Sequence, residues 1–358
     1  MRASAACALA MFACGAVPPA AAQPAPRAEP GLRPVATYSI VARDPATGEL
    51  GVAVQSHWFG VGAIVPFAEA GIGAVATQSF VDPSYGPLGL ELMRAGRTAP
   101  EALAGLIEAD PHPDVRQVAM VDAAGRVAVH TGENAIIAAG HQTGEGYSIQ
   151  ANMMASATVW PAMAAAFEAT DGDLAERMLA ALDAAQAEGG DVRGRQSAAL
   201  LVVSGTSTGR PWVDRLYDLR IEDHPEPLAE LRRLLLLARA YREMNAGDEA
   251  MTVNDVDAAV ARYDAAATLV PENAEMVYWA GITLASVGRL DDALPRLERA
   301  YAADPGWAVL TARLPEAGLL PDDPALLSRL LSVPGGEPGI EEWRRLAAEG
   351  MAPSPPVP

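Results

Sequence analysis

The sequence contains no lysine, since all 26 of its basic residues are arginine. This absence excludes a lysine Schiff base, a P-loop lysine and a lysine that lowers the pKa of a neighbouring nucleophile. Any fixed positive charge in a site must therefore come from arginine. The planar guanidinium of arginine suits the recognition of a carboxylate better than the transfer of a proton.

Cysteine and aromatic residues are also scarce. The only cysteines are Cys7 and Cys14, so removal of an export signal leaves a mature chain without thiols. Structural disulfides, thiolate nucleophiles and zinc-cysteine sites are then excluded. Aromatic residues make up 5% of the chain, whereas apolar residues make up 50%. The core is therefore expected to consist of small and aliphatic side chains in closely packed layers.

The chain has no excess of positive charge, because its formal net charge is −19 at pH 7. Binding to a phosphate backbone requires a basic face and the release of counterions. We therefore expect no nucleic-acid partner. The acidity is interpreted as a feature that promotes solubility.

The N-terminus has the features of a signal peptide over residues 1–22. Arg2 precedes an apolar run too short to span a bilayer, and Ala20, Ala21 and Ala22 supply small residues before a cleavage site. The sequence predicts a secreted or periplasmic protein without a transmembrane anchor. Lipidation at Cys14 is the alternative, although the residues before it match a lipobox poorly. Residues 23–34 are rich in proline and are predicted to form an extended linker.

A folded domain is expected over residues 35–225. Two strand-like runs, 37–43 and 49–56, are separated by DPATG, which has the composition of a tight turn and predicts a β-hairpin. Further strand-like segments alternate with pairs of segments that have helical spacing of apolar residues. The later strand-like segments are 71–79, 116–122, 125–132, 146–154, 196–203 and 214–224, and the helical ones are 85–96, 99–110, 158–170 and 173–189. This pattern predicts an α+β domain with a mostly antiparallel sheet.

A small all-α domain is expected over residues 226–346, followed by a disordered tail over 347–358. Pro271 and Pro305 lie 34 positions apart and close two similar phrases, AVARYDAAATLVPEN and ALPRLERAYAADPGW. The characteristic positions of a tetratricopeptide repeat are filled by Gly247, Ala259, Tyr263, Ala266 and Pro271, and again by Gly281, Ala293, Ala300 and Pro305. The pattern degrades at Pro315. Two repeats bury little surface, so they are expected to pack on a helix over 228–244 and on the first domain.

Several segments within residues 37–237 together resemble the family called domain of unknown function 1028. They include TYSIVARDPATGELGVAVQS, GIGAVATQSFVDPSYGPLGLELM, GYSIQANMM and LRIEDHPEPLAELRRLL. The resemblance implies an αββα sandwich of the N-terminal nucleophile (Ntn) hydrolase-like class. In Ntn hydrolases, the free amine of an N-terminal Thr, Ser or Cys acts as the base for its own side chain.

The resemblance implies Thr37 as the nucleophile. Ala36 precedes it, so an active amine requires cleavage of the bond between Ala36 and Thr37, which signal removal near Ala22 does not provide. In the alternative interpretation, Thr37 is a β-branched residue that favours the first strand.

Other polar residues near the ends of predicted strands are candidate site residues. Ser39 shares the strand face of Thr37, so it is the alternative nucleophilic hydroxyl or else an ordinary strand residue. Asn152 can donate its amide to an oxyanion or cap a turn. Gln78 and Ser79 close another strand and either line the same cleft or merely end the strand.

The loop GGDVRGRQS concentrates charged and hydrogen-bonding side chains before a predicted strand. Arg193 or Arg195 can hold a substrate carboxylate through two hydrogen bonds, and Asp191 and Gln196 are further candidates for substrate binding. The alternative is a loop whose charges pair with one another at the surface.

The histidines indicate no metal or catalytic pair. His57 follows Ser56, but neighbours on a strand point to opposite faces and cannot meet. His224 precedes Pro225, where capping of a turn is expected. The remaining histidines lack ligand spacing such as HExxH, and nearby acids form no calcium loop. We therefore expect neither a metal nor a cofactor.

Two functions fit the sequence. The first is an exported amide hydrolase acting on a small amide or peptide, with Thr37 as nucleophile, Asn152 as oxyanion donor and an arginine as carboxylate anchor. The second is a non-catalytic envelope protein that uses the sandwich as a scaffold and the tetratricopeptide-like helices to hold a peptide or partner protein. A mature chain beginning at Thr37 favours the first function, and one beginning near Gln23 favours the second.

Overall fold

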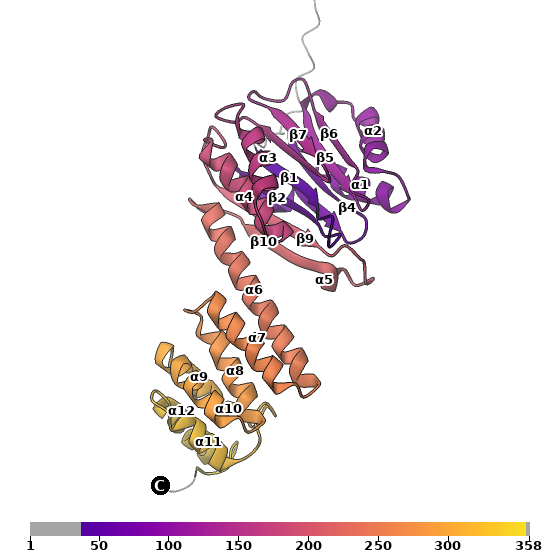
Figure 1. Cartoon of the computed structure of the whole chain (residues 1–358). Helices are drawn as coiled ribbons and strands as arrows, with labels where there is room; N and C mark the ends of the chain where they lie inside the picture. The colour runs from indigo at the N-terminus through magenta and orange to yellow at the C-terminus, as the bar shows by residue number, and fades with distance from the viewer. Residues whose placement is uncertain (1–36, 356–358) are drawn as a thin grey trace, which may run out of the picture. The chain divides into compact units, whose positions relative to one another are not determined.

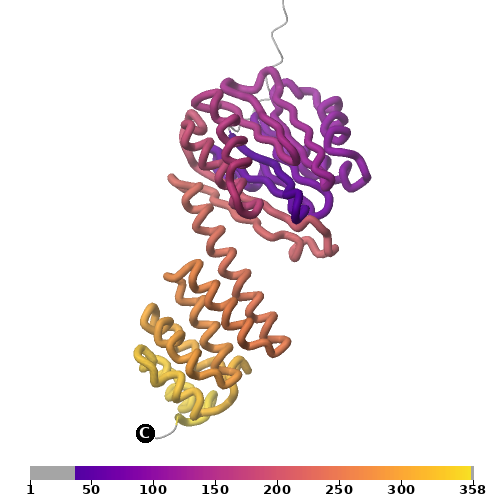
Figure 2. Tube along the Cα trace, in the orientation of Figure 1, coloured from indigo at the N-terminus to yellow at the C-terminus, as the bar shows by residue number. Residues whose placement is uncertain are grey.

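The computed structural model describes residues 37–355 (Figures 1 and 2). The predicted signal peptide, the alternative lipidation site at Cys14 and the linker over 23–34 lie outside the described residues. Within the described range, no helix combines the length and apolar character needed to cross a membrane.

Two antiparallel sheets form the centre of the first domain. The six-stranded sheet has the order β10-β9-β2-β1-β8-β7, and the four-stranded sheet has the order β3-β4-β5-β6. The strands of the larger sheet are β1 (Thr37–Arg43), β2 (Leu50–Ser56), β7 (Gly140–Gly144), β8 (Tyr147–Asn152), β9 (Ser197–Val203) and β10 (Arg215–Ile221). Those of the smaller sheet are β3 (Pro66–Glu69), β4 (Gly73–Ser79), β5 (Arg116–Asp122) and β6 (Val127–Thr131). The predicted hairpin of β1 and β2 and the antiparallel pairing are confirmed.

Pairs of helices cover the outer faces of both sheets (Figure 1). The larger sheet packs against α3 (Val159–Ala169) and α4 (Leu174–Ala187), and the smaller sheet packs against α1 (Tyr85–Arg94) and α2 (Ala99–Ala109). A capping box begins α2, with the Thr98 hydroxyl accepting from the Glu101 amide and the Glu101 carboxylate accepting from the Thr98 amide. The predicted αββα sandwich is therefore confirmed.

Side chains along β1 alternate between two environments. Tyr38 and Ile40 pack into the core beneath α3 and α4, whereas Val41 packs into the core between the two sheets. Because alternate side chains of a strand face the same side, Thr37 and Ser39 share the side of Val41. The start of β1 therefore directs hydroxyl groups into the interior of the sandwich.

Three elements of the sandwich were not predicted. β7 is an edge strand of sequence GHQTG, β3 is a four-residue strand, and α5 (Pro211–Asp214) is a single helical turn. None of these segments has a clear apolar periodicity, so backbone pairing and tertiary contacts determine them.

The second part of the described chain is helical, as predicted. It consists of α6 (Pro227–Thr252), α7 (Val256–Leu269), α8 (Ala274–Ser286), α9 (Leu290–Ala303), α10 (Gly306–Arg313), α11 (Pro324–Leu331) and α12 (Glu337–Ala348). A Cβ on Gly247 would lie 2.4 Å from the Tyr263 ring, which explains the glycine in the first repeat. α12 continues past the predicted start of the tail at 347, and the Trp343 indole donates to the Pro353 carbonyl at 2.8 Å.

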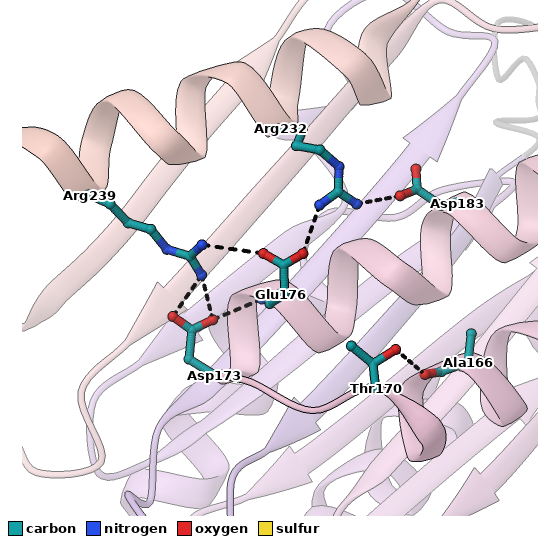
Figure 3. A network of polar contacts seen from close by, with 7 residues as sticks. All are labelled: Ala166, Thr170, Asp173, Glu176, Asp183, Arg232 and Arg239. Carbon is teal, nitrogen blue, oxygen red and sulfur yellow. Dashed lines mark hydrogen bonds and ion pairs between the residues drawn. The ribbon is translucent and has the colours of Figure 1, made fainter. Parts of the chain in front are cut away.

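The helix expected over 228–244 is longer than predicted, and its N-terminal half is joined to α4 by ion pairs (Figure 3). Arg239 contacts Asp173 at 2.8 Å and Glu176 at 3.3 Å. Arg232 contacts Glu176 at 2.8 Å and also pairs with Asp183. The shared carboxylate of Glu176 makes this a connected network rather than a set of isolated pairs.

Replacing both Arg232 and Arg239 by glutamine is expected to lower the free energy of unfolding by about 1–2 kcal/mol, because partly exposed ion pairs each contribute ~0.2–1 kcal/mol. Urea denaturation at low salt and in 1 M NaCl measures the loss, which should shrink in high salt. The matched control is Arg344→Gln on α12, for which no ion pair is found among the described residues. An equal loss at both salt concentrations would contradict the electrostatic assignment.

Candidate functional site

Strand pairing places Thr37 between two polar side chains. Thr37 lies opposite Ser56 of β2 on one side and opposite Asn152 of β8 on the other. All three residues are fully buried. The Thr37 hydroxyl donates to Ser56 Oγ at 3.2 Å. The hydroxyl predicted as nucleophile and the amide predicted as oxyanion donor therefore share one end of the larger sheet.

Two glutamines of the smaller sheet reach across the interior to this end. Gln78 Nε2 donates to Gln117 Oε1 at 2.7 Å and to the Thr37 carbonyl at 3.2 Å. Asn152 Nδ2 donates to the same Gln117 Oε1 at 3.0 Å. Gln117 thus connects Gln78 and Asn152, and Gln78 connects this pair to Thr37. Gln117 belongs to β5, which is distant from all three in sequence.

Ser39 occupies a second position in this network. Its hydroxyl donates to Gln78 Oε1 at 2.6 Å and accepts from Gln150 Nε2 at 2.6 Å. The two hydrogen bonds hold the Ser39 hydroxyl between side chains of both sheets. We define the interior network as Thr37, Ser39, Ser56, Gln78, Gln117, Gln150 and Asn152.

No member of the interior network carries a formal charge. The neighbouring Tyr38 faces the opposite side of β1, where burial raises the pKa of its phenol well above the ordinary value. Tyr38 is therefore protonated at neutral pH and supplies no base. Asn152 Oδ1 is buried and has no hydrogen-bond partner among residues 37–355. The arrangement can hold a hydroxyl and an amide in place, but it provides no side-chain base next to Thr37.

The loop after α4 reaches the same end of the sheet through Asp191. Its carboxylate accepts from the His57 amide at 2.9 Å, directly after Ser56. Arg193 donates to this carboxylate at 2.9 Å, and the Asp191 side chain is fully buried. The structure therefore brings Asp191 and Arg193 close to the β2 end, with the arginine already engaged by the aspartate.

Arg195 and Gln196 point to other partners. Arg195 pairs with Glu226 at the surface, and Gln196 donates to Asp223 at 3.1 Å. Both partners lie outside the loop, and the two side chains match the alternative interpretation of a salt-bridged surface loop.

Ser79 lies next to Gln78 but is set apart by its backbone. Its φ of 69° is in the left-handed region, and its hydroxyl is buried without a partner within the described part of the chain. Gln78 therefore joins the interior network, whereas no hydrogen bond connects Ser79 to it.

The predicted capping role of His224 is confirmed, because its Nδ1 accepts from the Glu226 amide at 3.0 Å. Over the described residues, no cluster of three or more His, Cys, Asp or Glu side chains has the geometry to hold a metal.

Sequence reasoning missed Gln117 and Gln150 as members of the network, although both lie in correctly predicted strands. Gln117 shares its face of β5 with Ala119 and Val121 of the core between the sheets, and Gln150 shares its face of β8 with Ser148 and Asn152. A glutamine at such an inward position needs hydrogen-bond partners, and this signal could have identified both.

The comparisons with known proteins agree with both sequence resemblances. The model of a family of unknown function, DUF1028, matches residues 37–231, and the model of a tetratricopeptide repeat matches residues 244–307. No curated protein matches the chain.

Two solved structures are similar to the first domain. Protein SPO2555 from Silicibacter pomeroyi, described under DUF1028, is 32% identical with a TM-score of 0.50, over 56% of this chain and 84% of that one. Anbu (ancestral beta-subunit) from Yersinia bercovieri is 15% identical with a TM-score of 0.28, over 55% of this chain and 91% of that one.

Proposed function

The chain belongs to the family of unknown function DUF1028, and we propose that it is an exported Ntn-type hydrolase of a small amide or peptide. The observation that carries the proposal is the position of Thr37 at the start of a central strand, between Ser56 and Asn152. Cleavage between Ala36 and Thr37 releases the amine that this chemistry requires.

In the proposed reaction, Thr37 Oγ1 attacks the amide carbonyl while the α-amine of Thr37 takes the hydroxyl proton. The resulting oxyanion accepts a hydrogen bond from Asn152 Nδ2, whose partner in the structure is Gln117. The ammonium then gives its proton to the leaving amine as the C–N bond breaks. Water attacks the Thr37 ester with the amine as base, and the carboxylic acid and the free hydroxyl are released.

The test combines the N-terminus of the exported protein with its activity. Protein recovered from the periplasm or the medium is analysed by intact mass and N-terminal sequencing, and hydrolysis of simple anilides is measured. We expect a chain that begins at Thr37 and hydrolyses an anilide. A chain that begins near Gln23 and shows no turnover would contradict the proposal, and retention in the cytoplasm would contradict export.

A second function, in which the helical part holds a peptide or partner protein, is favoured by a specific feature. α6, the start of α8 and Trp307 of α10 line a hollow of about 380 Å³. Tetratricopeptide repeats present such surfaces for binding. The same experiment separates the two candidates, because an inactive chain that keeps the residues before Thr37 leaves binding as the function.

A further inference from the structure

Three strongly exposed apolar side chains lie on loops that adjoin the candidate site. Phe59 is 68% exposed, Ile137 is 87% exposed and Val192 is 66% exposed. Single exposed apolar residues are common on protein surfaces. These three differ because their loops are all joined to the strand ends that carry Ser56 and Asn152. We call them the apolar rim.

Backbone hydrogen bonds fix two of these loops beside Asn152. The amides of Met153 and Met154, directly after Asn152, donate to the carbonyls of Ile136 and Ala138 at 3.1 Å each. Ile137 is held between these two anchors. On the other side, the Val192 amide donates to the Met153 carbonyl at 3.1 Å. Ile137 and Val192 therefore flank the chain that leaves β8.

The third loop, which carries Phe59, follows β2 and is hydrogen-bonded to the loop that carries Asp191 and Val192. Phe59 lies three residues after Ser56, and the intervening His57 donates its amide to the Asp191 carboxylate at 2.9 Å. Asp191 adjoins Val192 in sequence. The rim residues thus come from three separate segments that converge on the end of the sheet where Thr37 lies.

The charge of this region fits an uncharged ligand. The interior network contains only hydroxyls and amides, and the Asp191 carboxylate beside it is fully buried and paired with Arg193 at 2.9 Å. A second ionised group brought to this pair would have to compete with an existing ion pair and lose hydration. An apolar group bound at the rim has no charge to desolvate, and its binding is favoured because apolar surface is removed from water.

We propose that the apolar rim recognises an uncharged aliphatic acyl chain, which makes the substrates medium-chain acyl amides. This inference rests on the proposed function, because it places the acyl carbonyl at Thr37. The acyl group stays attached through both chemical steps, whereas the amine leaves after the first. Contacts with the acyl chain therefore contribute to both steps.

The first experiment uses the processed protein and a series of p-nitroanilides. Acetyl, hexanoyl and ω-carboxyhexanoyl anilides differ only in chain length and terminal charge. We expect kcat/KM to rise on the order of tenfold from acetyl to hexanoyl, as partial burial of four methylene groups predicts, and to fall again for the charged chain. No rise with length, or equal use of the charged chain, would overturn the inference.

Rim variants connect that preference to the three residues. In the triple variant Phe59→Ser, Ile137→Ser and Val192→Ser, the hexanoyl-to-acetyl ratio should fall towards one. The matched control is Val253→Ser in the helical part, where a valine that is also strongly exposed, at 75%, is replaced. This control should keep the ratio of the unmodified protein, and a triple variant that also keeps it would contradict the role of the rim.

A binding measurement separates failure of this inference from failure of the proposed chemistry. Calorimetry with hexanamide and acetamide is performed on Thr37→Ala, which needs no turnover. Tighter binding of hexanamide that is lost in the rim variant supports the inference even if no anilide is hydrolysed. Equal affinity for both amides overturns it even if the protein proves to be an amidase.

Discussion

Replacing Thr37 by alanine is expected to lower anilide hydrolysis by the processed protein at least about 1000-fold, as loss of a catalytic nucleophile does. The change removes the hydroxyl that donates to Ser56 at 3.2 Å. Loss of that hydrogen bond should cost about 1 kcal/mol of stability. The fold should therefore survive while turnover is lost, and steady-state kinetics together with urea denaturation separate the two effects.

Two further variants make this result specific. Thr37→Ser keeps a hydroxyl and an α-amine, so it should still be processed and should retain measurable turnover. Thr268→Ala is the matched control, because it removes a threonine hydroxyl that donates only to the Asp264 carbonyl on an exposed helix face. Full activity of Thr37→Ala would show that Thr37 is not the nucleophile. If Ser39→Ala then lost activity, Ser39 would be identified as the reacting hydroxyl.

The position of Thr37 relative to Asn152 shows which part of the candidate site can be predicted from the sequence and which part cannot. The apolar alternation of residues 37–43 predicts a strand with Thr37 and Ser39 on one face, and the structure places both toward the interior. The partner strand across from Thr37 does not follow from local pattern. It depends on the pairing of β1 with β8, whose residues lie more than 100 positions away.

Edges and loops were the least predictable parts of the fold. β7 has the sequence GHQTG and becomes a strand because β8 offers it an open edge for backbone hydrogen bonds. Of its side chains only that of Thr143 favours a strand, and the flanking glycines are equally compatible with a turn. The apolar rim has the same origin, since exposure of Phe59, Ile137 and Val192 is set by how their loops are anchored.

The arginines of the loop at 190–197 show why residue type alone does not define a site. Arg193 and Arg195 were equivalent candidates for a carboxylate anchor. In the structure, Arg193 forms an ion pair with the buried Asp191, whereas Arg195 forms an ion pair with Glu226 at the surface. Two positions along an irregular loop are enough to direct the side chains to different surroundings, and sequence spacing does not predict that direction.

Replacing Gln117 by leucine is expected to lower the free energy of unfolding by about 3–5 kcal/mol, although the two side chains have similar volume. Gln117 Oε1 accepts from Gln78 and Asn152, and its Nε2 donates to the Ala151 carbonyl at 3.0 Å. Leucine removes all of these hydrogen bonds. It leaves the buried Asn152 amide without its partner, which costs about 1–3 kcal/mol, and it takes one acceptor from Gln78 Nε2, which keeps the Thr37 carbonyl. Urea denaturation measures the loss, and a change within about 0.5 kcal/mol would contradict a tightly satisfied network.

The control Gln142→Leu changes the same residue type on the edge strand β7, where no side-chain hydrogen bond of Gln142 is found among the described residues. It should alter stability by less than about 0.5 kcal/mol.

Q117E provides a second, pH-dependent readout. Burial raises the folded pKa of the introduced carboxyl above its unfolded value of about 4.3. The destabilisation of Q117E relative to the unmodified protein should therefore be smallest at low pH and should grow as the pH rises above about 4, because the interior network offers no cation to pair with the carboxylate. A destabilisation that stays constant between pH 4 and pH 7 would mean that water reaches Gln117, and the network would then be hydrated rather than closed.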